Sequence, residues 1–478
     1  MNEQSLLERF APSVPVDPRD VAARVAASGV TFFVLDDDPT GTQSVANLPV
    51  ITSWSSDDIR WALDSNSPAV YVLTNTRSLG PREAEARNRE IVEATVAVAR
   101  ATSRAVAFVS RGDSTLRGHY PLETDTLADA LVAEGFAQPN GVVIVPAFPD
   151  AGRVTIDSVH YYRTGGVLTP VGETEFAADA TFGYSSSNLI DWVVEKHDGE
   201  IDASSVIALT LDVVRQGPEA IAAVLRTAHD AAPIVVDVVV EDDMRLLALG
   251  LALVEAEGST FIYRVGPPFM RARIGQEIAS PITPGQLDHV AHPEHGGLIV
   301  VGSHVDLTTR QLAALRAAHP DTVAVEIDVA TITNPELREA HIDEVVGAVT
   351  AALQTGNAIV NTSRALVTAA TAQESLAISR EVSAAVVTVV QRVLAECPPQ
   401  FVIAKGGITS SDVATFGLSI HRAIVAGPML PGIVSLWEPV DGPARGIPYI
   451  VFAGNVGDED SLVAVVDTFT AAAAARRA

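Results

Sequence analysis

Residues 32–43 read FFVLDDDPTGTQ, in which an apolar run stops at three consecutive aspartates and a Pro-Thr-Gly-Thr segment. A short apolar run bounded by Asp, Pro and Gly is typical of a buried strand that ends in a turn. Similar runs recur, separated by helical stretches at 81–100, 121–134, 216–229 and 242–256. This alternation predicts a parallel sheet covered by helices on both faces. The runs lie at 31–35, 69–74, 105–110, 141–148, 205–212, 232–240 and 261–266.

The same alternation restarts at residues 297–303 and continues to a final helix at 458–475. Between the two series, residues 277–296 lose the periodicity and concentrate Pro, Gly and His, as linkers do. A chain of 478 residues is also too long for one ordinary hydrophobic core. The sequence therefore predicts two α/β domains, each a mostly parallel sheet flanked by helices. Their expected bounds are 1–280 and 297–478, with a linker at 281–296.

Composition excludes several classes of protein. The net charge of −27 argues against nucleic acid or an anionic membrane as a partner, and an anionic substrate would need a local cationic pocket. With no apolar run of about 18 residues and no leader pattern, we expect a cytoplasmic protein. The single cysteine, Cys397, excludes an internal disulfide, and the histidines show neither HExxH nor paired spacing, so a transition-metal site has little support. A homo-oligomer is left open.

Polar residues follow four successive strands of the first predicted domain. Ligands of such sheets bind outside the carboxyl ends of the strands, so these residues are the candidates for chemistry. Arginine suits carboxylate or phosphate, whereas Asp and hydroxyls suit sugar hydroxyls. A pocket for a small polyhydroxylated anion is the natural inference, although a solvated loop with local ion pairs is the plainer alternative. The candidates are Asp36–Asp38 with Thr40, Arg77, the segment 110–119 with Arg111, Asp113, Ser114, Thr115 and Arg117, and Arg153.

The three aspartates admit more than one interpretation. A turn or helix cap accounts for one of them, but three crowded carboxylates favour function. Asp36-x-Asp38-x-Thr40 also fits the first motif of haloacid dehalogenase-type phosphatases, in which the first Asp attacks phosphorus and the second is an acid/base. That family needs a lysine and an acidic pair on the same domain. Here Lys405 and the acidic cluster 457–460 fall in the second predicted domain, which weakens the phosphatase hypothesis.

Three strand-turn-helix segments of the second predicted domain carry Gly and hydroxyl residues, at 302–311, 404–412 and 453–460. One Gly-rich turn is weak evidence, but three on one sheet favour a nucleotide phosphate site at helix N-termini. Neither a Walker A motif nor GxGxxG is present. Lys405, one of two lysines in the chain, lies at the end of an apolar strand, so it is a candidate phosphate contact as well as an ordinary surface residue.

With these motifs the chain resembles the four-carbon acid sugar kinases over roughly residues 31–475. These have a sugar-binding N-terminal domain and a nucleotide-binding C-terminal domain, and they phosphorylate the terminal hydroxyl of threonate, erythronate or oxo-tetronate with ATP. Asp36, Pro39 and Thr42 depart from the usual pattern, which leaves the exact substrate open. The resemblance rests on Asp37-Asp38, Thr40-Gly41, Asp113–Gly118, Pro146–Pro149, Gly152-Arg153, Gly302-Ser303, Thr362–Arg364, Gly406-Gly407, Thr409-Ser410, Gly454-Asn455 and Gly457-Asp458.

The resemblance implies a set of site residues and the cofactors ATP and Mg²⁺. Arginines would clamp the substrate carboxylate, Asp38 or Asp37 would orient or deprotonate the hydroxyl, and closure about 277–296 would exclude water. If the first strand continued through the aspartates, Asp36 and Asp38 would share one side.

A non-catalytic sugar-acid-binding protein is a further alternative. The substrate set is Thr40, Arg77, Asp113, Ser114, Thr115, Arg117 and Arg153, and the nucleotide set is Ser303, Lys405, Gly406, Gly407, Ile408, Thr409, Gly454, Asn455 and Gly457; metal ligands are not assigned.

Overall fold

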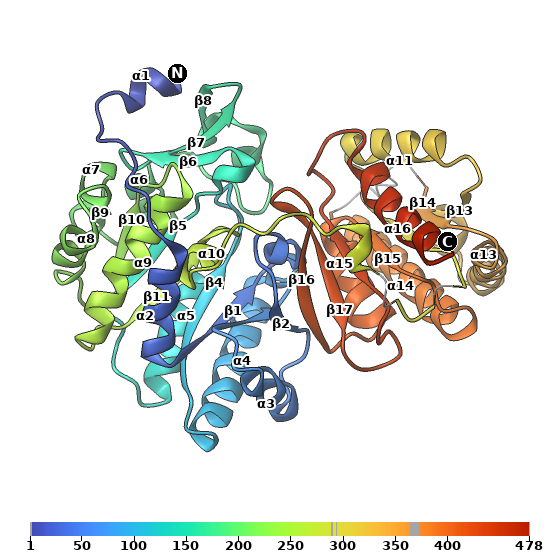
Figure 1. Ribbon diagram of the computed structural model, residues 1–478, viewed down its shortest axis with the longest axis horizontal. Coiled ribbons are helices and arrows are strands. Elements are labelled where there is room, and N and C mark those ends of the chain that lie inside the picture. The colour runs from blue at the N-terminus through green and yellow to red at the C-terminus, as the bar shows by residue number, and fades with distance from the viewer. Residues whose placement is uncertain (1, 288–289, 293, 364–371, 478) are drawn as a thin grey trace. The chain divides into compact units, whose positions relative to one another are not determined.

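The computed structural model describes residues 2–287, 290–292, 294–363 and 372–477 (Figure 1). Contacts along the chain divide it into two compact units. The first comprises Met1–Pro49 and Ser53–Ile278, and the second comprises Val50–Thr52 and Ala279–Ala478. Arg364, which the resemblance includes, lies outside the described residues.

The first unit contains a parallel sheet in the strand order β3-β1-β4-β11-β5-β10-β9, and each of these pairings is parallel. Residues 31–36 of the central strand β1 are all buried, so both of its faces are covered, as the apolar runs predict. The strands are β1 (Val30–Asp36), β3 (Ala69–Leu73), β4 (Ala105–Arg111), β5 (Gly141–Val145), β9 (Ile207–Leu209), β10 (Ala232–Val236) and β11 (Phe261–Val265). A short strand, β2 (Leu48–Ile51), begins in the first unit and ends in the second.

The helices of the first unit pack in groups. Helix α4 packs against α3 and α5, and α9 packs against α2, α8 and α10. Apolar residues on their inner sides, such as Ile91 and Val92 of α4 and Leu247 of α9, are fully buried. The helices are α1 (Glu3–Leu7), α2 (Pro18–Ser28), α3 (Ser56–Asp64), α4 (Pro81–Ala101), α5 (Leu122–Ala133), α6 (Leu189–Lys196), α7 (Leu211–Val214), α8 (Pro218–Leu225), α9 (Glu241–Ala256) and α10 (Phe269–Arg273).

A second, antiparallel sheet of the first unit is absent from the sequence expectations. It consists of β6 (Arg153–Ile156), β7 (Val159–Thr164) and β8 (Val167–Pro170) in that order. Its apolar side packs on Phe10, Leu211 and Val239. The strands are short and mix Arg, His and Tyr with apolar residues, so their periodicity is weak. This sheet places Arg153 at the start of a strand, not in a loop.

The second unit contains a sheet in the order β13-β14-β12-β15-β18-β17-β16, parallel from β13 to β18 and antiparallel at β17 and β16. One side of it packs in a core that includes Ile299, Phe401 and Phe469. The elements are β12 (Leu298–Val301), α11 (Asp306–Ala318), β13 (Val323–Ile327), α12 (Val329–Ile332), α13 (Arg338–Leu353), β14 (Ala358–Thr362), α14 (Ala372–Glu396), β15 (Val402–Lys405), α15 (Gly407–Asp412), β16 (Arg422–Leu430), β17 (Ile433–Pro439), β18 (Tyr449–Phe452) and α16 (Ser461–Arg477).

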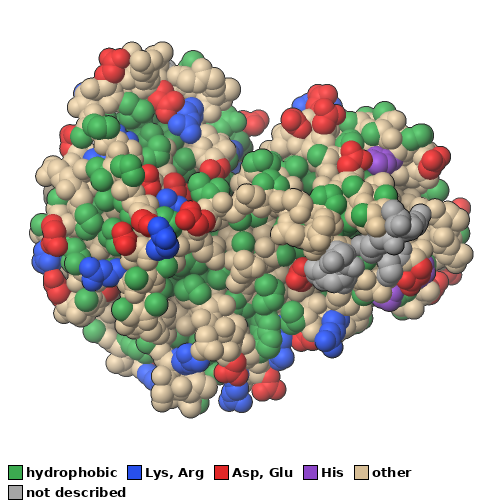
Figure 2. Space-filling view, viewed as in Figure 1, with side chains coloured by type: hydrophobic (Ala, Val, Ile, Leu, Met, Phe, Trp, Pro, Cys, Tyr) green, Lys and Arg blue, Asp and Glu red, His purple; other side chains and the backbone are tan. Residues whose placement is uncertain are grey.

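The predicted fold class, two α/β domains with mostly parallel sheets flanked by helices, is confirmed. Among the described residues, no helix has both the length and the apolar character needed to cross a bilayer. Acidic and basic side chains are interspersed on the face shown in Figure 2.

Candidate functional site

The last residues of the neighbouring strands β1 and β4, Asp36 and Arg111, lie opposite each other and form a buried ion pair. Burial raises the pKa of Asp36, while the Arg111 guanidinium opposes that rise. Gly41 lies against this pair, because a Cβ there would collide with both side chains. Asp36 is only 1% exposed, whereas the phosphatase hypothesis needs its carboxylate open to a substrate phosphorus. The geometry therefore disfavours that hypothesis.

Asp37 is held by Arg77, which follows β3. The Nε and Nη2 atoms of Arg77 donate to the two carboxylate oxygens of Asp37 at 3.0 and 2.6 Å. Such a bidentate pair fixes the orientation of both side chains. Strand β1 ends at Asp36, and Asp37 already lies in a bend. The strand alternation considered for the three aspartates therefore does not apply to them.

Asp38 is the most accessible of the three aspartates, with a side chain 18% exposed against 2% for Asp36 and Asp37. It caps a short 3-10 helix, Pro39–Ser44, by accepting from the amide and hydroxyl of Thr40 at 2.9 and 2.6 Å. Burial acts to raise its pKa, but Arg77, Arg111 and the Thr40 hydrogen bonds outweigh it, so the pKa of Asp38 is lowered. Asp38 is thus an ionised, partly open hydrogen-bond acceptor.

The segment after β4 brings Asp113 next to Arg117, and Arg117 shares a ring contact with Arg153. Asp113 accepts from the Thr115 hydroxyl and from Nε of Arg117, the latter at 2.7 Å. Burial opposes ionisation, but Arg77, Arg117 and the Thr115 hydrogen bond lower the pKa of Asp113. Arg117 and Arg153 both lie over the ring of Phe176, at 5.2 and 5.9 Å from its centroid. The structure thus brings together residues that follow β4 and β5.

Arg153 differs from the other arginines of this group in how little it is paired. Its guanidinium lies 4.9 Å from the centroid of Tyr162 and donates from Nη1 to the carbonyl of Ala151 at 2.7 Å. Its Nε is buried and has no hydrogen-bond partner among the described residues. Burial lowers the pKa of Arg153, and the Asp113 carboxylate opposes that. A buried donor without a partner is a candidate ligand contact.

The backbone of this segment is supported by residues that the sequence interpretation missed. Arg264, the fourth residue of β11, donates to Ser110 Oγ, Glu123 Oε2 and the carbonyl of Arg117 at 3.1, 3.0 and 3.0 Å. Its guanidinium occupies the space that side chains at Gly112 and Gly118 would fill. A lone arginine inside the apolar run FIYRVG was the available signal.

Two more supporting residues fix the carbonyl groups of Ser114 and Thr115. His160 of β7 donates from Nε2 to the Ser114 carbonyl at 2.8 Å, and Tyr184 donates to the Thr115 carbonyl at 2.8 Å. The Nδ1 atom of His160 bonds to Thr155 Oγ1 at 2.9 Å. Burial lowers the pKa of His160 to about 4, so its ring is neutral at pH 7. Both side chains therefore hold the backbone of the 113–117 segment in place.

In the second unit, the three predicted turns meet around two hydroxyl residues, Ser303 and Thr409. A Cβ at Gly302 would collide with Thr409 Oγ1, and one at Gly454 would come 2.5 Å from Ser303 Oγ. Gly406 has a φ of +128°, and a Cβ there would lie 3.2 Å from both Ser303 Cβ and Thr409 Oγ1. The turns after β12, β15 and β18 thus form one glycine-lined cradle. Because glycine has no side chain, a phosphate group can approach the backbone amides of such turns closely.

Other members of the predicted nucleotide set surround this cradle. Thr308 of α11 donates to the carbonyl of Gly454 at 2.8 Å, which ties two of the turns together. Gly457 has a φ of +81° and lies against Ser461, the first residue of α16. Ile408 and Asn455 are exposed, Ile408 by 60%, and Gly407 is half-buried.

Lys405 lies at the end of β15 with its side chain fully buried. Its Nζ donates to the carbonyl of Ala453 at 2.6 Å and lies 3.7 Å from the centroid of the Phe452 ring. Burial lowers the pKa of Lys405 to about 7. In this conformation the lysine supports the turn that contains Gly454.

Metal ligands at the cradle were not predicted, and the structure offers few. Within the described ranges, no three His, Cys, Asp or Glu side chains at these turns come close enough together to hold an ion. A Mg²⁺ ion here would therefore take most of its oxygen ligands from phosphate groups and water, as Mg²⁺ commonly does.

Two family models match this chain. A model of a sugar-binding N-terminal domain matches residues 32–273, and a model of a nucleotide-binding C-terminal domain matches residues 298–462. The chain belongs to the four-carbon acid sugar kinase family. The glycine-lined cradle lies within the match to the nucleotide-binding domain. The charged site lies within the match to the sugar-binding domain and consists of Asp36–Asp38, Arg77, Arg111, Asp113, Arg117 and Arg153.

One curated relative and two solved structures define the similarity further. D-erythronate kinase of Heliobacterium modesticaldum is 28% identical over 289 residues, which cover 59% of this chain and 57% of that protein. The chain thus matches little more than half the length of this relative. Structures of a Salmonella typhimurium LT2 protein and a Haemophilus influenzae protein give TM-scores of 0.63 and 0.62 at 18% identity, each over 91% of this chain and 98% and 100% of theirs. They share its fold.

Proposed function

We propose that this protein is an ATP-dependent kinase that phosphorylates the terminal hydroxyl of a four-carbon acid sugar. The division of polar groups carries the proposal: paired charges lie on the domain matched as sugar-binding, and an uncharged cradle lies on the domain matched as nucleotide-binding. The relative that acts as a D-erythronate kinase makes erythronate the first substrate to test. Use of ATP as the donor implies a cytoplasmic location, and a homo-oligomer stays a prediction for light scattering.

On the sugar side, the arginines divide into two kinds. Arg77 and Arg111 already pair with Asp37 and Asp36, so they position those carboxylates. Arg117 is bonded to Asp113 through Nε, but it converges with Arg153 over Phe176, and Arg153 keeps a free buried donor. We therefore assign Arg117 and Arg153 to the substrate carboxylate. A planar guanidinium stacked on a ring presents its donors in a fixed direction. This narrows the expected arginine clamp to two residues.

Asp38 is the residue that we assign to the reacting hydroxyl. It is ionised and partly exposed, so it can accept a hydrogen bond from the hydroxyl and direct an oxygen lone pair at phosphorus. Phosphoryl transfer proceeds through a loose transition state in which positioning matters more than early proton removal. A carboxylate of lowered pKa suits that task. Asp37, with both oxygens bound to Arg77, acts as a positioning residue.

On the nucleotide side, the turn amides around Ser303 and Thr409 would bind the phosphates of ATP, since a glycine backbone allows close approach. Mg²⁺ bound to those phosphates would neutralise negative charge on the transferred group. Lys405 supports the Gly454 turn through Ala453. Transfer further requires the phosphate on one domain to reach the hydroxyl on the other, with water excluded.

A coupled assay of ADP release tests the proposal. Purified protein receives ATP, Mg²⁺ and, one at a time, the stereoisomers of erythronate, threonate and oxo-tetronate. We expect ADP release with at least one acid at a rate well above the acid-free control, together with one phosphorylated acid per ADP. Release of inorganic phosphate from a phosphorylated acid without nucleotide would support the phosphatase instead. Binding of an acid without ADP release would support the non-catalytic alternative.

A further inference from the structure

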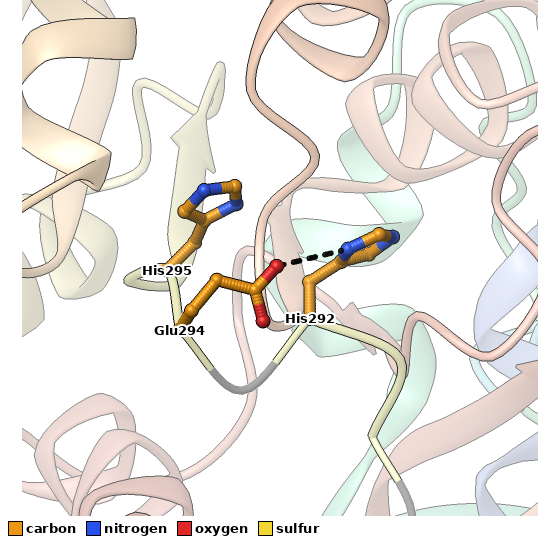
Figure 3. A group of neighbouring side chains, drawn as sticks. All are labelled: His292, Glu294 and His295. Atoms are coloured by element: carbon orange, nitrogen blue, oxygen red, sulfur yellow. Dashed lines mark ion pairs between the residues drawn. The ribbon is translucent and has the colours of Figure 1, made fainter.

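Three side chains with metal-ligating atoms come together in the segment that precedes β12: His292, Glu294 and His295 (Figure 3). One ligand atom from each lies within 4.8 Å of the others. The sequence interpretation treated this His-rich segment only as part of a linker and found little support for a transition-metal site. The spacing His-x-Glu-His matches none of the helical zinc motifs, so only the conformation of the segment brings the three groups together.

The distance between two of these atoms suits a shared cation. Nδ1 of His292 and Oε1 of Glu294 are 3.5 Å apart, and the carboxylate points toward the imidazole (Figure 3). Two ligands of a tetrahedral Zn²⁺ at bond lengths near 2 Å are about 3.3 Å apart. The two imidazole rings are also nearly parallel, with an interplanar angle of 15° and centroids 6.2 Å apart.

The orientation of His295 is fixed by the backbone. Its Nδ1 lies 2.6 Å from the carbonyl oxygen of Pro398. A carbonyl only accepts, so Nδ1 carries the proton and Nε2 of the neutral ring offers its lone pair. Metal-binding histidines commonly donate their second ring nitrogen to a carbonyl in this way. Pro398 follows α14, so this hydrogen bond ties His295 to the α14–β15 connection.

The charge of the cluster also favours a cation. The Glu294 carboxylate contributes a negative charge to the three ligand atoms. His292 and Glu294 are partly exposed, with side chains 32% and 59% accessible, which leaves room for water ligands. Two nitrogens and one carboxylate are a ligand set for Zn²⁺ and similar metals, whereas Mg²⁺ prefers oxygen alone.

We propose that His292, Glu294 and His295 form a binding site for Zn²⁺ or a similar divalent transition metal, completed by water. The site is separate from the nucleotide cradle and from the Mg²⁺ expected there. Its role is structural: it fixes the side chains of His292, Glu294 and His295 relative to one another, and His295 is bonded to Pro398. The proposal does not depend on kinase activity.

Calorimetric titration with Zn²⁺ tests the site. The full chain is prepared without a histidine tag, treated with a chelator and dialysed. We expect one Zn²⁺ per chain, binding that 10 mM Mg²⁺ does not displace, and at least a tenfold loss of affinity in His292→Ala and His295→Ala. Glu294→Gln keeps the shape of the side chain and should also weaken binding. His319→Ala is the matched control, because His319 contacts a single carboxylate, Asp467, at 2.9 Å in the same unit.

Thermal melting provides a second readout that does not use activity. Zn²⁺ should raise Tm for the wild type and for His319→Ala, and it should leave Tm unchanged in the variant that combines His292→Ala, Glu294→Gln and His295→Ala. Circular dichroism of the metal-free proteins checks that every variant folds. The proposal is wrong if the wild type does not bind Zn²⁺, or if the combined variant binds it as tightly as the wild type.

Discussion

The two candidate sites of this protein use opposite means to shape a binding surface. At the carboxyl ends of β1 and β4, the first unit gathers charged side chains and pairs them with one another, as Asp36 does with Arg111 and Asp37 with Arg77. At the turns after β12, β15 and β18, the second unit uses glycines whose backbone lies close to the side chains of Ser303 and Thr409. We expect the first site to recognise its ligand through charged groups of fixed direction, and the second through the room that its glycines leave.

This difference changes what a substitution does. Removing one member of a buried ion pair leaves an uncompensated charge, which costs several kcal/mol. Adding one methyl group at a crowded glycine forces atoms apart without any change of charge. Substitutions at the two sites should therefore impair the protein in distinguishable ways.

The largest effect is expected at Asp38, the accessible carboxylate of the charged site. Asp38→Asn should lower kcat by about 10²- to 10⁴-fold, because a neutral amide cannot direct the hydroxyl as a carboxylate does. Binding of ATP, measured by calorimetry, should stay near the wild-type value. Asp57→Asn, at an exposed position of α3, is the control and should leave kcat unchanged. Wild-type turnover in Asp38→Asn would contradict the role assigned to it.

The next largest effect is expected at the cradle. Gly302→Ala should weaken ATP binding by about 10- to 100-fold, because the new Cβ meets Thr409 Oγ1 and overpacking typically costs 1–3 kcal/mol. Affinity for the acid sugar should not change. Gly347→Ala is a matched control: this glycine lies in α13 with no atom near the added methyl group, so the change should slightly stabilise the helix. Unchanged ATP affinity in Gly302→Ala would remove the cradle from the nucleotide site.

The pH dependence of folding stability should reveal the contribution of His160, which supports the 113–117 segment of the first unit. Burial holds the pKa of His160 at about 4, below its ordinary value. The folded state therefore binds fewer protons than the unfolded state below about pH 6.5, so the contribution of His160 is complete above that pH and is lost as pH falls toward 4. The loss should be about 2 kcal/mol between pH 7 and 5.

Urea unfolding at pH 7 and pH 5 checks this contribution. His160→Gln should lack it, so the stability difference between the two pH values becomes smaller than in the wild type. His229→Gln, at an exposed position, should behave as the wild type does. Equal pH dependence in His160→Gln and the wild type would show that the buried ring is not the source.

The smallest of the four effects is expected at Arg153. Arg153→Lys keeps the positive charge but loses the planar group that lies over Tyr162 and Phe176. KM for the acid sugar should rise about tenfold, which corresponds to roughly 1.4 kcal/mol. KM for ATP should not change. Arg226→Lys, whose arginine pairs with Glu257 at the surface, is the control, and an equal rise in KM there would contradict a specific role for Arg153.

Most of the fold follows from periodicity, because buried strands and amphipathic helices leave strong local patterns. The helix expected at 81–100 is α4, Pro81–Ala101, and the strand expected at 105–110 is β4, Ala105–Arg111. The sheet of β6 to β8 was missed because its residues mix polar and apolar types without a clear period. The strand β16 was missed because Gly427 and Pro428 interrupt its apolar run. Local patterns therefore identify the buried parallel strands better than the antiparallel strands β6 to β8 and β16.

The sequence predicts which charged residues follow the strands, but not which of them form ion pairs with one another. The sequence indicates that charged residues end neighbouring strands, yet only the register of β1 and β4 shows that Arg111 pairs with Asp36. Arg264 lies within an apolar strand, and its contacts with Ser110 and Arg117 cross 154 and 147 residues of sequence. Contacts between such distant residues leave no local signal.

We expect the two ligands to bind to separate sites of different construction. A crossed calorimetric titration tests it most directly: Gly302→Ala and Arg153→Lys are each titrated with ATP and with the acid sugar that the ADP assay identifies. We predict that Gly302→Ala loses affinity only for ATP and that Arg153→Lys loses affinity only for the acid. Loss of both affinities in each folded variant, or loss of the opposite one, would contradict the claim.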